Sequence, residues 1–175
     1  MGRNVEIKAR IASVDGLEPR VRALADQGPF DIAQDDSFFA ASQGRLKLRE
    51  FADGRGELIA YDRVDATGPR VSSYQIAATP DPAALRAVLQ QALGLTGRVR
   101  KQRRLYLSGR TRLHLDRVEG LGDFLELEVV LVEGEPFEAG EREAEALLAA
   151  LDIDPSQHLA VAYVDLLAEC QESVP

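Results

Sequence analysis

Residues 110–130 read RTRLHLDRVEGLGDFLELEVV, and charged and apolar side chains alternate along them. In the first half the alternating polar residues are Arg112, His114 and Asp116, and in the second half they are Glu126 and Glu128. A period of two residues is that of a β-strand, whose successive side chains point to opposite faces. The stretch therefore predicts two strands, each with one charged and one apolar face.

The same alternation recurs elsewhere, with Arg45, Lys47 and Arg49 on one face of a further segment. Short turn-type sequences such as Ser108-Gly109 connect neighbouring segments, which predicts mostly antiparallel pairing. The register of 99–107 is ambiguous because basic residues occupy both faces, and a β-bulge there would resolve it. The predicted strands cover residues 4–11, 37–41, 45–51, 57–64, 70–77, 99–107, 111–118 and 124–132.

Amphipathic helices are predicted over 82–93 and 140–151 and from 155 onwards, with a shorter one near 18–27. The first has Asp81 as N-cap and Pro82 at its first position. If these helices cover the apolar faces of the strands, the charged faces point either to solvent or into a closed interior. An open sheet would leave them in water, whereas a barrel would enclose them as a polar cavity.

Composition narrows the class of protein. The chain has 175 residues, of which 45% are hydrophobic, and we predict one domain over 1–175. A net charge of −8 argues against a nucleic-acid partner. There is no apolar stretch near the ~20 residues that span a bilayer and no signal peptide, so we expect a cytoplasmic protein with no membrane partner. Cys170 is the one cysteine, which excludes an intrachain disulfide and a metal–thiolate cluster.

The predicted inner face carries an unusual mixture of charges. Many like charges at close range destabilise a fold unless they face acids or a multivalent anion. A polyphosphate suits the bases, and Mg²⁺ or Mn²⁺ suits the carboxylates, because both ions prefer oxygen ligands. The bases are Lys8, Arg45, Lys47, Arg49, Arg63, Arg70, Lys101, Arg103 and Arg112, and the acids are Glu6, Asp116, Glu126 and Glu128.

The segment Asn4-Val5-Glu6-Ile7-Lys8 resembles the Glu-x-Glu-x-Lys signature strand of the CYTH, or triphosphate tunnel metalloenzyme, superfamily. This resemblance implies an α+β fold: a closed eight-stranded antiparallel β-barrel with helices packed outside and a charged tunnel within. It also implies magnesium dependence and a triphosphate-containing substrate. Further blocks resemble, in order, the class IV adenylyl cyclase-like branch at residues 34–39, 44–50, 58–63, 70–74, 100–104, 112–116, 121–128 and 162–167.

The resemblance also implies roles for individual residues. The implied metal ligands are Glu6, Glu126 and Glu128, and Asp116 would line the metal side of the tunnel. The implied phosphate contacts are Lys8, Arg45, Lys47, Arg63, Lys101, Arg103 and Arg112. On this basis we predict catalytic roles for Lys8, Arg63 and Asp116, and we add Arg49 and His114 to the substrate-binding residues. His114 has an alternative, which is to pair with Asp116 or another tunnel carboxylate.

One residue departs from the signature. Asn4 stands where the signature has its first glutamate. An amide oxygen is uncharged and is a weaker metal ligand than a carboxylate. We therefore expect a second metal site to be weakened while single-metal chemistry survives. Three functions stay open: an adenylyl cyclase that converts ATP to cyclic AMP and pyrophosphate, a triphosphatase that releases phosphate, and a non-catalytic triphosphate-binding or sensing domain. The substrate could be a nucleoside triphosphate, tripolyphosphate or another organic triphosphate. The sequence is compatible with a homodimer and does not determine the oligomeric state.

Overall fold

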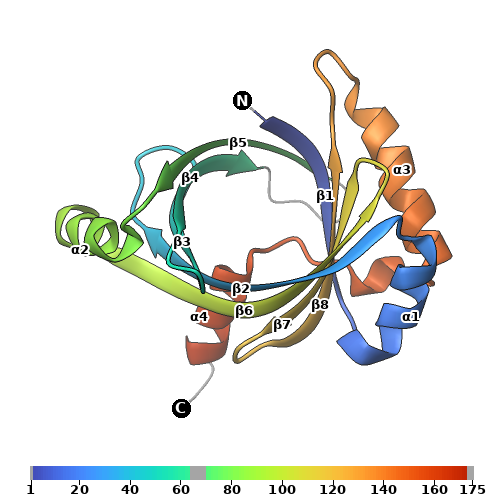
Figure 1. Cartoon of the computed structure of the whole chain (residues 1–175), viewed down its shortest axis with the longest axis horizontal. Helices are drawn as coiled ribbons and strands as arrows, with labels where there is room; N and C mark the ends of the chain where they lie inside the picture. The colour runs from blue at the N-terminus through green and yellow to red at the C-terminus, as the bar shows by residue number, and fades with distance from the viewer. Residues whose placement is uncertain (1, 64–69, 173–175) are drawn as a thin grey trace.

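The computed structural model describes residues 2–63 and 70–172, and its strands close into an antiparallel barrel in the order β1-β5-β4-β3-β2-β6-β7-β8 (Figure 1). The prediction of a closed eight-stranded antiparallel barrel with helices is confirmed. The strands are β1 (Gly2–Arg10), β2 (Gln27–Phe39), β3 (Arg45–Phe51), β4 (Gly56–Arg63), β5 (Arg70–Thr79), β6 (Leu95–Ser108), β7 (Thr111–Val118) and β8 (Gly122–Val130). The helices are α1 (Val14–Leu24), α2 (Pro82–Leu93), α3 (Phe137–Ala150), the short η1 (Pro155–Gln157) and α4 (Tyr163–Glu172).

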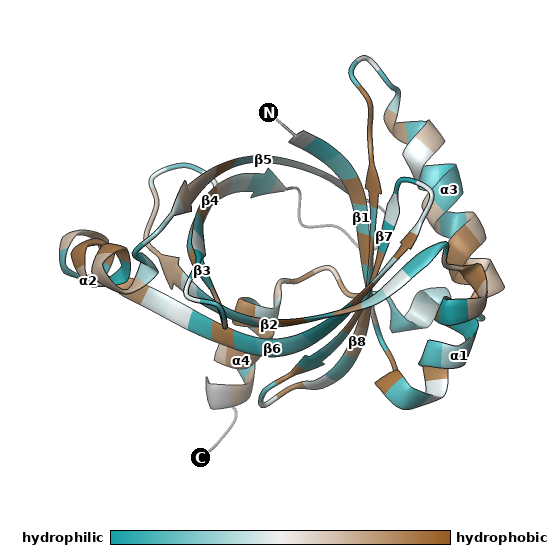
Figure 2. Cartoon of the chain, in the orientation of Figure 1, coloured by the Kyte–Doolittle hydropathy of each residue, from teal (hydrophilic) through white to brown (hydrophobic). Residues whose placement is uncertain are grey.

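Helices α1 and α3 lie on one side of the barrel and α2 lies on the opposite side (Figure 1). The apolar faces of β1, β7 and β8 point toward α1 and α3, and Figure 2 shows hydrophilic and hydrophobic residues alternating along β1. The resulting core is fully buried and contains Ile7, Val14, Val21, Leu113, Leu115, Leu125, Leu127 and Leu151. Because the apolar faces point outward into this layer, the charged faces of the same strands point into the barrel.

The register sets the charged residues opposite one another across neighbouring strands. Lys8 on β1 pairs with Glu126 on β8, which in turn lies opposite His114 on β7. Arg103 on β6 lies opposite Asp116 on β7. Side chains directly opposite on one face of a sheet lie close enough to interact, so the register alone brings acids and bases together.

A second apolar cluster closes one end of the barrel. Phe38, Val99, Val118 and Phe124 stand at the strand ends that meet there, and Tyr163 at the start of α4 packs against them. The chain reaches this end after Leu159 donates its backbone N–H to the carbonyl of Lys8. The start of helix α4 therefore covers this end of the barrel.

Several predicted element boundaries differ from the observed ones. The helix near 18–27 begins at Val14, because Ser13 caps it by accepting a hydrogen bond from Gly16, and it ends at Leu24. The strand 37–41 begins ten residues earlier, at Gln27. The helix from 155 is only the short turn η1, since His158 then bridges to Ala9 and α4 starts at Tyr163.

The register of β6 resolves without a bulge between Arg98 and Arg104. Lys101 and Arg103 face inward, whereas Arg98 and Arg100 on the outer face pair with Asp35 of β2. This outer face of β2 and β6 is thus polar and carries its own ion pairs. The polar outer face also explains why residues 27–36 lacked the apolar alternation of a strand.

Within 2–63 and 70–172, no helix is both long and apolar enough to cross a bilayer.

Candidate functional site

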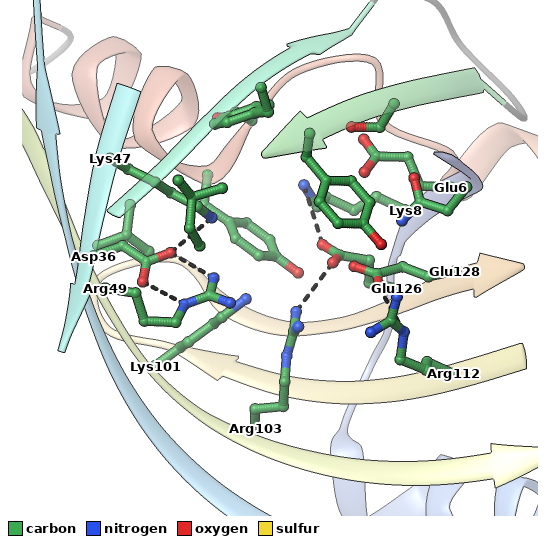
Figure 3. A pocket seen from close by; sticks show the side chains of 18 of the residues that line it. Glu6, Lys8, Asp36, Lys47, Arg49, Lys101, Arg103, Arg112, Glu126 and Glu128 are labelled. Atoms are coloured by element: carbon green, nitrogen blue, oxygen red, sulfur yellow. Dashed lines mark hydrogen bonds and ion pairs between the residues drawn. The ribbon is translucent and has the colours of Figure 1, made fainter. Parts of the chain in front are cut away.

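The barrel encloses a cavity of about 200 Å³ whose wall mixes cations, carboxylates and aromatic rings (Figure 3). Its cations are Lys8, Lys47, Arg49, Lys101, Arg103 and Arg112, and its carboxylates are Glu6, Asp36, Glu126 and Glu128. Its apolar part contains Phe38, Ile59, Tyr61, Tyr74, Ile76, Val99 and Tyr163. The described wall therefore carries more cations than carboxylates.

On one wall, Asp36 gathers two cations from β3. Lys47 Nζ lies 2.9 Å from Asp36 Oδ2, and Arg49 donates through Nε at 2.8 Å and Nη2 at 2.7 Å. Burial alone would raise the pKa of Asp36, but Arg49 and Lys47 outweigh it and hold that pKa far below its usual range. Burial and the neighbouring Arg49 lower the pKa of Lys47 to about 8, although Asp36 opposes the shift.

Behind the wall formed by β6, Asp116 holds a second pair of cations. Lys101 Nζ lies 2.9 Å from Asp116 Oδ2, Arg103 donates two hydrogen bonds of 2.7 Å, and the Tyr163 hydroxyl donates one of 3.1 Å. The Asp116 carboxylate is 0% exposed, so the charges that it contacts are those of protein side chains. Burial would raise the pKa of Asp116, but Arg103 and Lys101 lower it well below its usual range.

A third cluster joins β7, β8 and β1. Glu126 accepts a hydrogen bond of 3.1 Å from Arg103 and lies 3.5 Å from Lys8 Nζ, and Glu128 lies 3.1 Å from Arg112 Nε. Burial would raise the pKa of Glu126, but Arg103 and Lys8 lower it well below its usual range. Burial, reinforced by Arg103, lowers the pKa of His114, so its imidazole is neutral at neutral pH.

This third cluster fits a divalent metal ion. The ligand atoms of His114, Glu126 and Glu128 lie within 4.8 Å of one another. Carboxylate oxygens and imidazole nitrogens are groups that divalent cations bind in proteins. Glu6 lies directly opposite Glu128 in the register and lines the same cavity. Asn4 also lines it, and its buried Oδ1 has no hydrogen-bond partner in the described part of the chain.

The structure brings most of the predicted site residues together. Glu6, Lys8, Lys47, Arg49, Lys101, Arg103, Arg112, Glu126 and Glu128 line the cavity. His114 is 3% exposed and stands beside Glu126 and Glu128, and Asp116 lies behind Lys101 and Arg103. Arg45 instead pairs with Asp165 of α4 at 2.8 Å and is not part of the described cavity wall. The side chain of Arg63 lies outside the described residues.

Two residues of the site were missed in the sequence. Asp36 fell one residue before the predicted strand 37–41, so its place on the inner face was not recognised, although a longer strand would have shown it. Tyr163 sits in a helix, and no strand pattern could assign it to a barrel interior. Its ring also lies 4.0 Å from Lys8 Nζ and 5.0 Å from Lys101 Nζ.

The burial of Asp116 leads to a stability prediction. Asp116→Asn removes the charge that compensates Lys101 and Arg103, and removing one partner of a buried pair costs about 3–5 kcal/mol. Asp152→Asn is the matched control, because Asp152 is 87% exposed in its pair with Arg20, and we expect less than about 1 kcal/mol there. Urea denaturation of both variants measures the difference. Equal stability of the two would show that Asp116 does not hold the cations.

A family model agrees with the geometry. The model described as CYTH domain matches residues 2–163. A search of curated proteins found no match to this sequence.

Solved structures share the fold at low sequence identity. The PH1012 protein from Pyrococcus horikoshii is 21% identical, with a TM-score of 0.83 over 93% of this chain and 98% of that one. A Vibrio parahaemolyticus protein described as a candidate adenylate cyclase is 18% identical, with a TM-score of 0.73 and coverage of 94% and 97%. HpAC1 from Hippeastrum, described as having a dominant triphosphatase activity, is 16% identical, with a TM-score of 0.65 and coverage of 100% and 98%. With its barrel, its charged interior and a family model that spans residues 2–163, this chain belongs to the CYTH domain family.

Proposed function

We propose that the barrel cavity binds a triphosphate together with a divalent metal ion, and that the protein hydrolyses the triphosphate to release phosphate. The observation that carries this proposal is the set of six described cations around one cavity, held in place by carboxylates in the wall and behind it. Several cations converging on one small space match an anion that itself carries several charges. Arginine forks bind two phosphate oxygens at once, and lysines act as point charges.

The carboxylates behind the cations keep them in position. Asp116 fixes both Lys101 and Arg103, and Asp36 fixes Lys47 and Arg49. Donors that are already oriented stabilise charge that develops in a transition state without a reorganisation cost. We therefore propose that Asp116, predicted as catalytic, acts as a positioning residue. Lys8 lines the cavity and is proposed to contact the phosphate, and Arg63 keeps its predicted catalytic role as a proposal.

The proposed metal ion is Mg²⁺ or Mn²⁺, held by Glu126 and Glu128 with Glu6 nearby. When bound, it would neutralise charge on the phosphate oxygens and so favour attack at phosphorus. In the structure, Arg103, Lys8 and Arg112 neutralise the same carboxylates. A triphosphate would draw these cations to its oxygens, so we expect metal and triphosphate to strengthen each other's binding.

Hydrolysis makes the smaller demand on the site. It needs the triphosphate, the metal ion and a water molecule, whereas cyclisation also needs a ribose hydroxyl aimed at the α-phosphorus. The triphosphatase activity described for HpAC1 supports hydrolysis. A Schizosaccharomyces pombe RNA triphosphatase, Pct1, shares the fold with a TM-score of 0.51 at 11% identity.

Adenylyl cyclase is the second candidate, and the apolar part of the wall favours it. Tyr61, Tyr74, Ile59 and Ile76 line the cavity beside the cations and offer a surface for an organic group such as a nucleobase. The third candidate, a domain that only binds triphosphate, is favoured by Asn4 in place of the first glutamate of the signature.

The lowered pKa of Lys47 predicts a pH dependence of binding. A bound triphosphate favours the charged lysine, so binding takes up a proton near pH 8 and weakens as the pH rises through that value. Lys47→Arg keeps its charge over this range, so its affinity should not show that loss. Calorimetric titration with tripolyphosphate across this pH range measures both proteins, and the anion's own titration affects them equally. Identical pH profiles would rule out a role for Lys47 in binding.

Product analysis tests the reaction itself. The protein is incubated with Mg²⁺ or Mn²⁺ and, separately, with ATP, other nucleoside triphosphates, thiamine triphosphate and tripolyphosphate. We expect orthophosphate as the released product. Lys101→Met should lower the rate by about 10²–10³-fold, as the loss of a donor to developing charge does. Arg100→Met is the matched control, because Arg100 is the next residue of the same strand but points outward to Asp35, and its rate should be unchanged.

The alternatives give different products. Cyclic AMP with pyrophosphate would identify a cyclase, and binding without turnover across the panel would identify a sensing domain. A protein that neither binds nor converts any triphosphate would refute the proposal. An equal loss of rate in Arg100→Met and Lys101→Met would show that the inner face of β6 contributes no more to the reaction than its outer face.

A further inference from the structure

We propose that the imidazole of His114 is a ligand of the metal ion, and that the site therefore selects Mn²⁺ and other transition-metal ions over Mg²⁺. This inference rests on the metal-dependent function proposed above and specifies the metal. It makes His114 a determinant of metal specificity rather than a phosphate contact.

The first observation is an unsatisfied nitrogen in a buried place. His114 is 3% exposed, and its Nδ1 has no hydrogen-bond partner within the described residues. It points at two carboxylates, 3.6 Å from Glu126 Oε1 and 3.9 Å from Glu128 Oε1. Both separations exceed the length of a hydrogen bond. Leaving a buried polar atom without a partner costs about 1–3 kcal/mol, so this arrangement needs a reason.

The second observation is that these distances suit a shared cation. The three ligand atoms lie within 4.8 Å of one another. Two ligands on opposite sides of one metal ion are about 4 Å apart, because each bond is about 2 Å long. Small side-chain adjustments would therefore place all three atoms around one ion. The ladder supports this geometry, since His114 lies directly opposite Glu126 on the neighbouring strand.

The position of His114 argues against direct contact with the substrate. Glu126 and Glu128 line the cavity, whereas His114 is not part of the described wall. Both carboxylates also form ion pairs: Glu126 pairs with Arg103 and Lys8, and Glu128 pairs with Arg112. Among residues 2–63 and 70–172, the imidazole Nδ1 has no hydrogen-bond partner that it would have to lose before it could bind a metal ion.

The donor set then determines the selectivity. Mg²⁺ is a hard cation that prefers oxygen ligands and keeps its waters, whereas imidazole nitrogen suits transition metals. At a site made only of carboxylates, Mg²⁺ would compete with transition-metal ions for binding. One imidazole beside two carboxylates shifts the preference toward Mn²⁺, Co²⁺ or Zn²⁺.

Pulsed electron paramagnetic resonance tests this directly, because it detects ¹⁴N nuclei bound to Mn²⁺. The chain without added histidines is mixed with Mn²⁺ and tripolyphosphate, which contains no nitrogen, in a nitrogen-free buffer, and is frozen before turnover. We expect ¹⁴N modulation from the wild-type protein. It should disappear in His114→Gln and persist in His158→Gln, which alters the only other histidine of the chain. The Mn²⁺ affinity of His114→Gln should fall roughly tenfold or more, as even the loss of a partner to a metal ligand produces, with a smaller loss for Mg²⁺.

The wild-type spectrum is decisive even if His114→Gln does not fold. Bound Mn²⁺ without ¹⁴N modulation would overturn the inference and leave the proposed function intact. Modulation that survives in His114→Gln would also overturn it, because another nitrogen would then hold the ion. If neither Mn²⁺ nor tripolyphosphate binds the wild-type protein, the proposed function fails and this inference fails with it.

Discussion

The interior of this barrel depends on the two hydrogen bonds that Arg103 donates to Asp116. Arg103 is 6% exposed and also lies 3.1 Å from Glu126, so one guanidinium connects the buried Asp116 to a carboxylate of the candidate metal site. Desolvating such charges costs several kcal/mol per ion, and only complete mutual pairing repays it. The pKa of Arg103 is raised because Asp116 and Glu126 outweigh the burial that would lower it. Each of the other cations described in the cavity wall also pairs with a carboxylate, so the charges of the interior compensate one another.

The same ion pairs would allow the cations and carboxylates of the site to exchange partners with a phosphate and a metal ion. An internal carboxylate and a phosphate compete for the same guanidinium, and a metal ion and a guanidinium compete for the same carboxylate. If the proposed triphosphate and metal ion bind together, each ion pair that is lost would be replaced by another. The fully buried Asp116 is the exception, because it has no route to a ligand and keeps Lys101 and Arg103 oriented throughout. The fold thus separates residues that could exchange partners from a residue that fixes their geometry.

The local period of two predicted the strands and the residues that share their faces, whereas the closed barrel was implied by the resemblance to the CYTH superfamily. Glu126 and Glu128 had to share a face, and the leucines between them had to share the other. Positions that depend on distant parts of the chain could not be predicted. Arg45 has the right period for the cavity, yet it pairs with Asp165 because α4 plugs that end of the barrel. The distance of His114 from two carboxylates depends on the register of β7 against β8, which alternation alone does not fix.

A crystal structure of the protein with tripolyphosphate and Mn²⁺ tests the central claim most directly, because it shows which groups pair with the anion. We predict phosphate oxygens inside the barrel, within hydrogen-bond distance of Lys101 and Arg103, with Arg103 still bound to Asp116 but separated from Glu126. A tripolyphosphate bound instead to the outer arginines of β6, Arg98 and Arg100, with all interior ion pairs intact, would contradict the account.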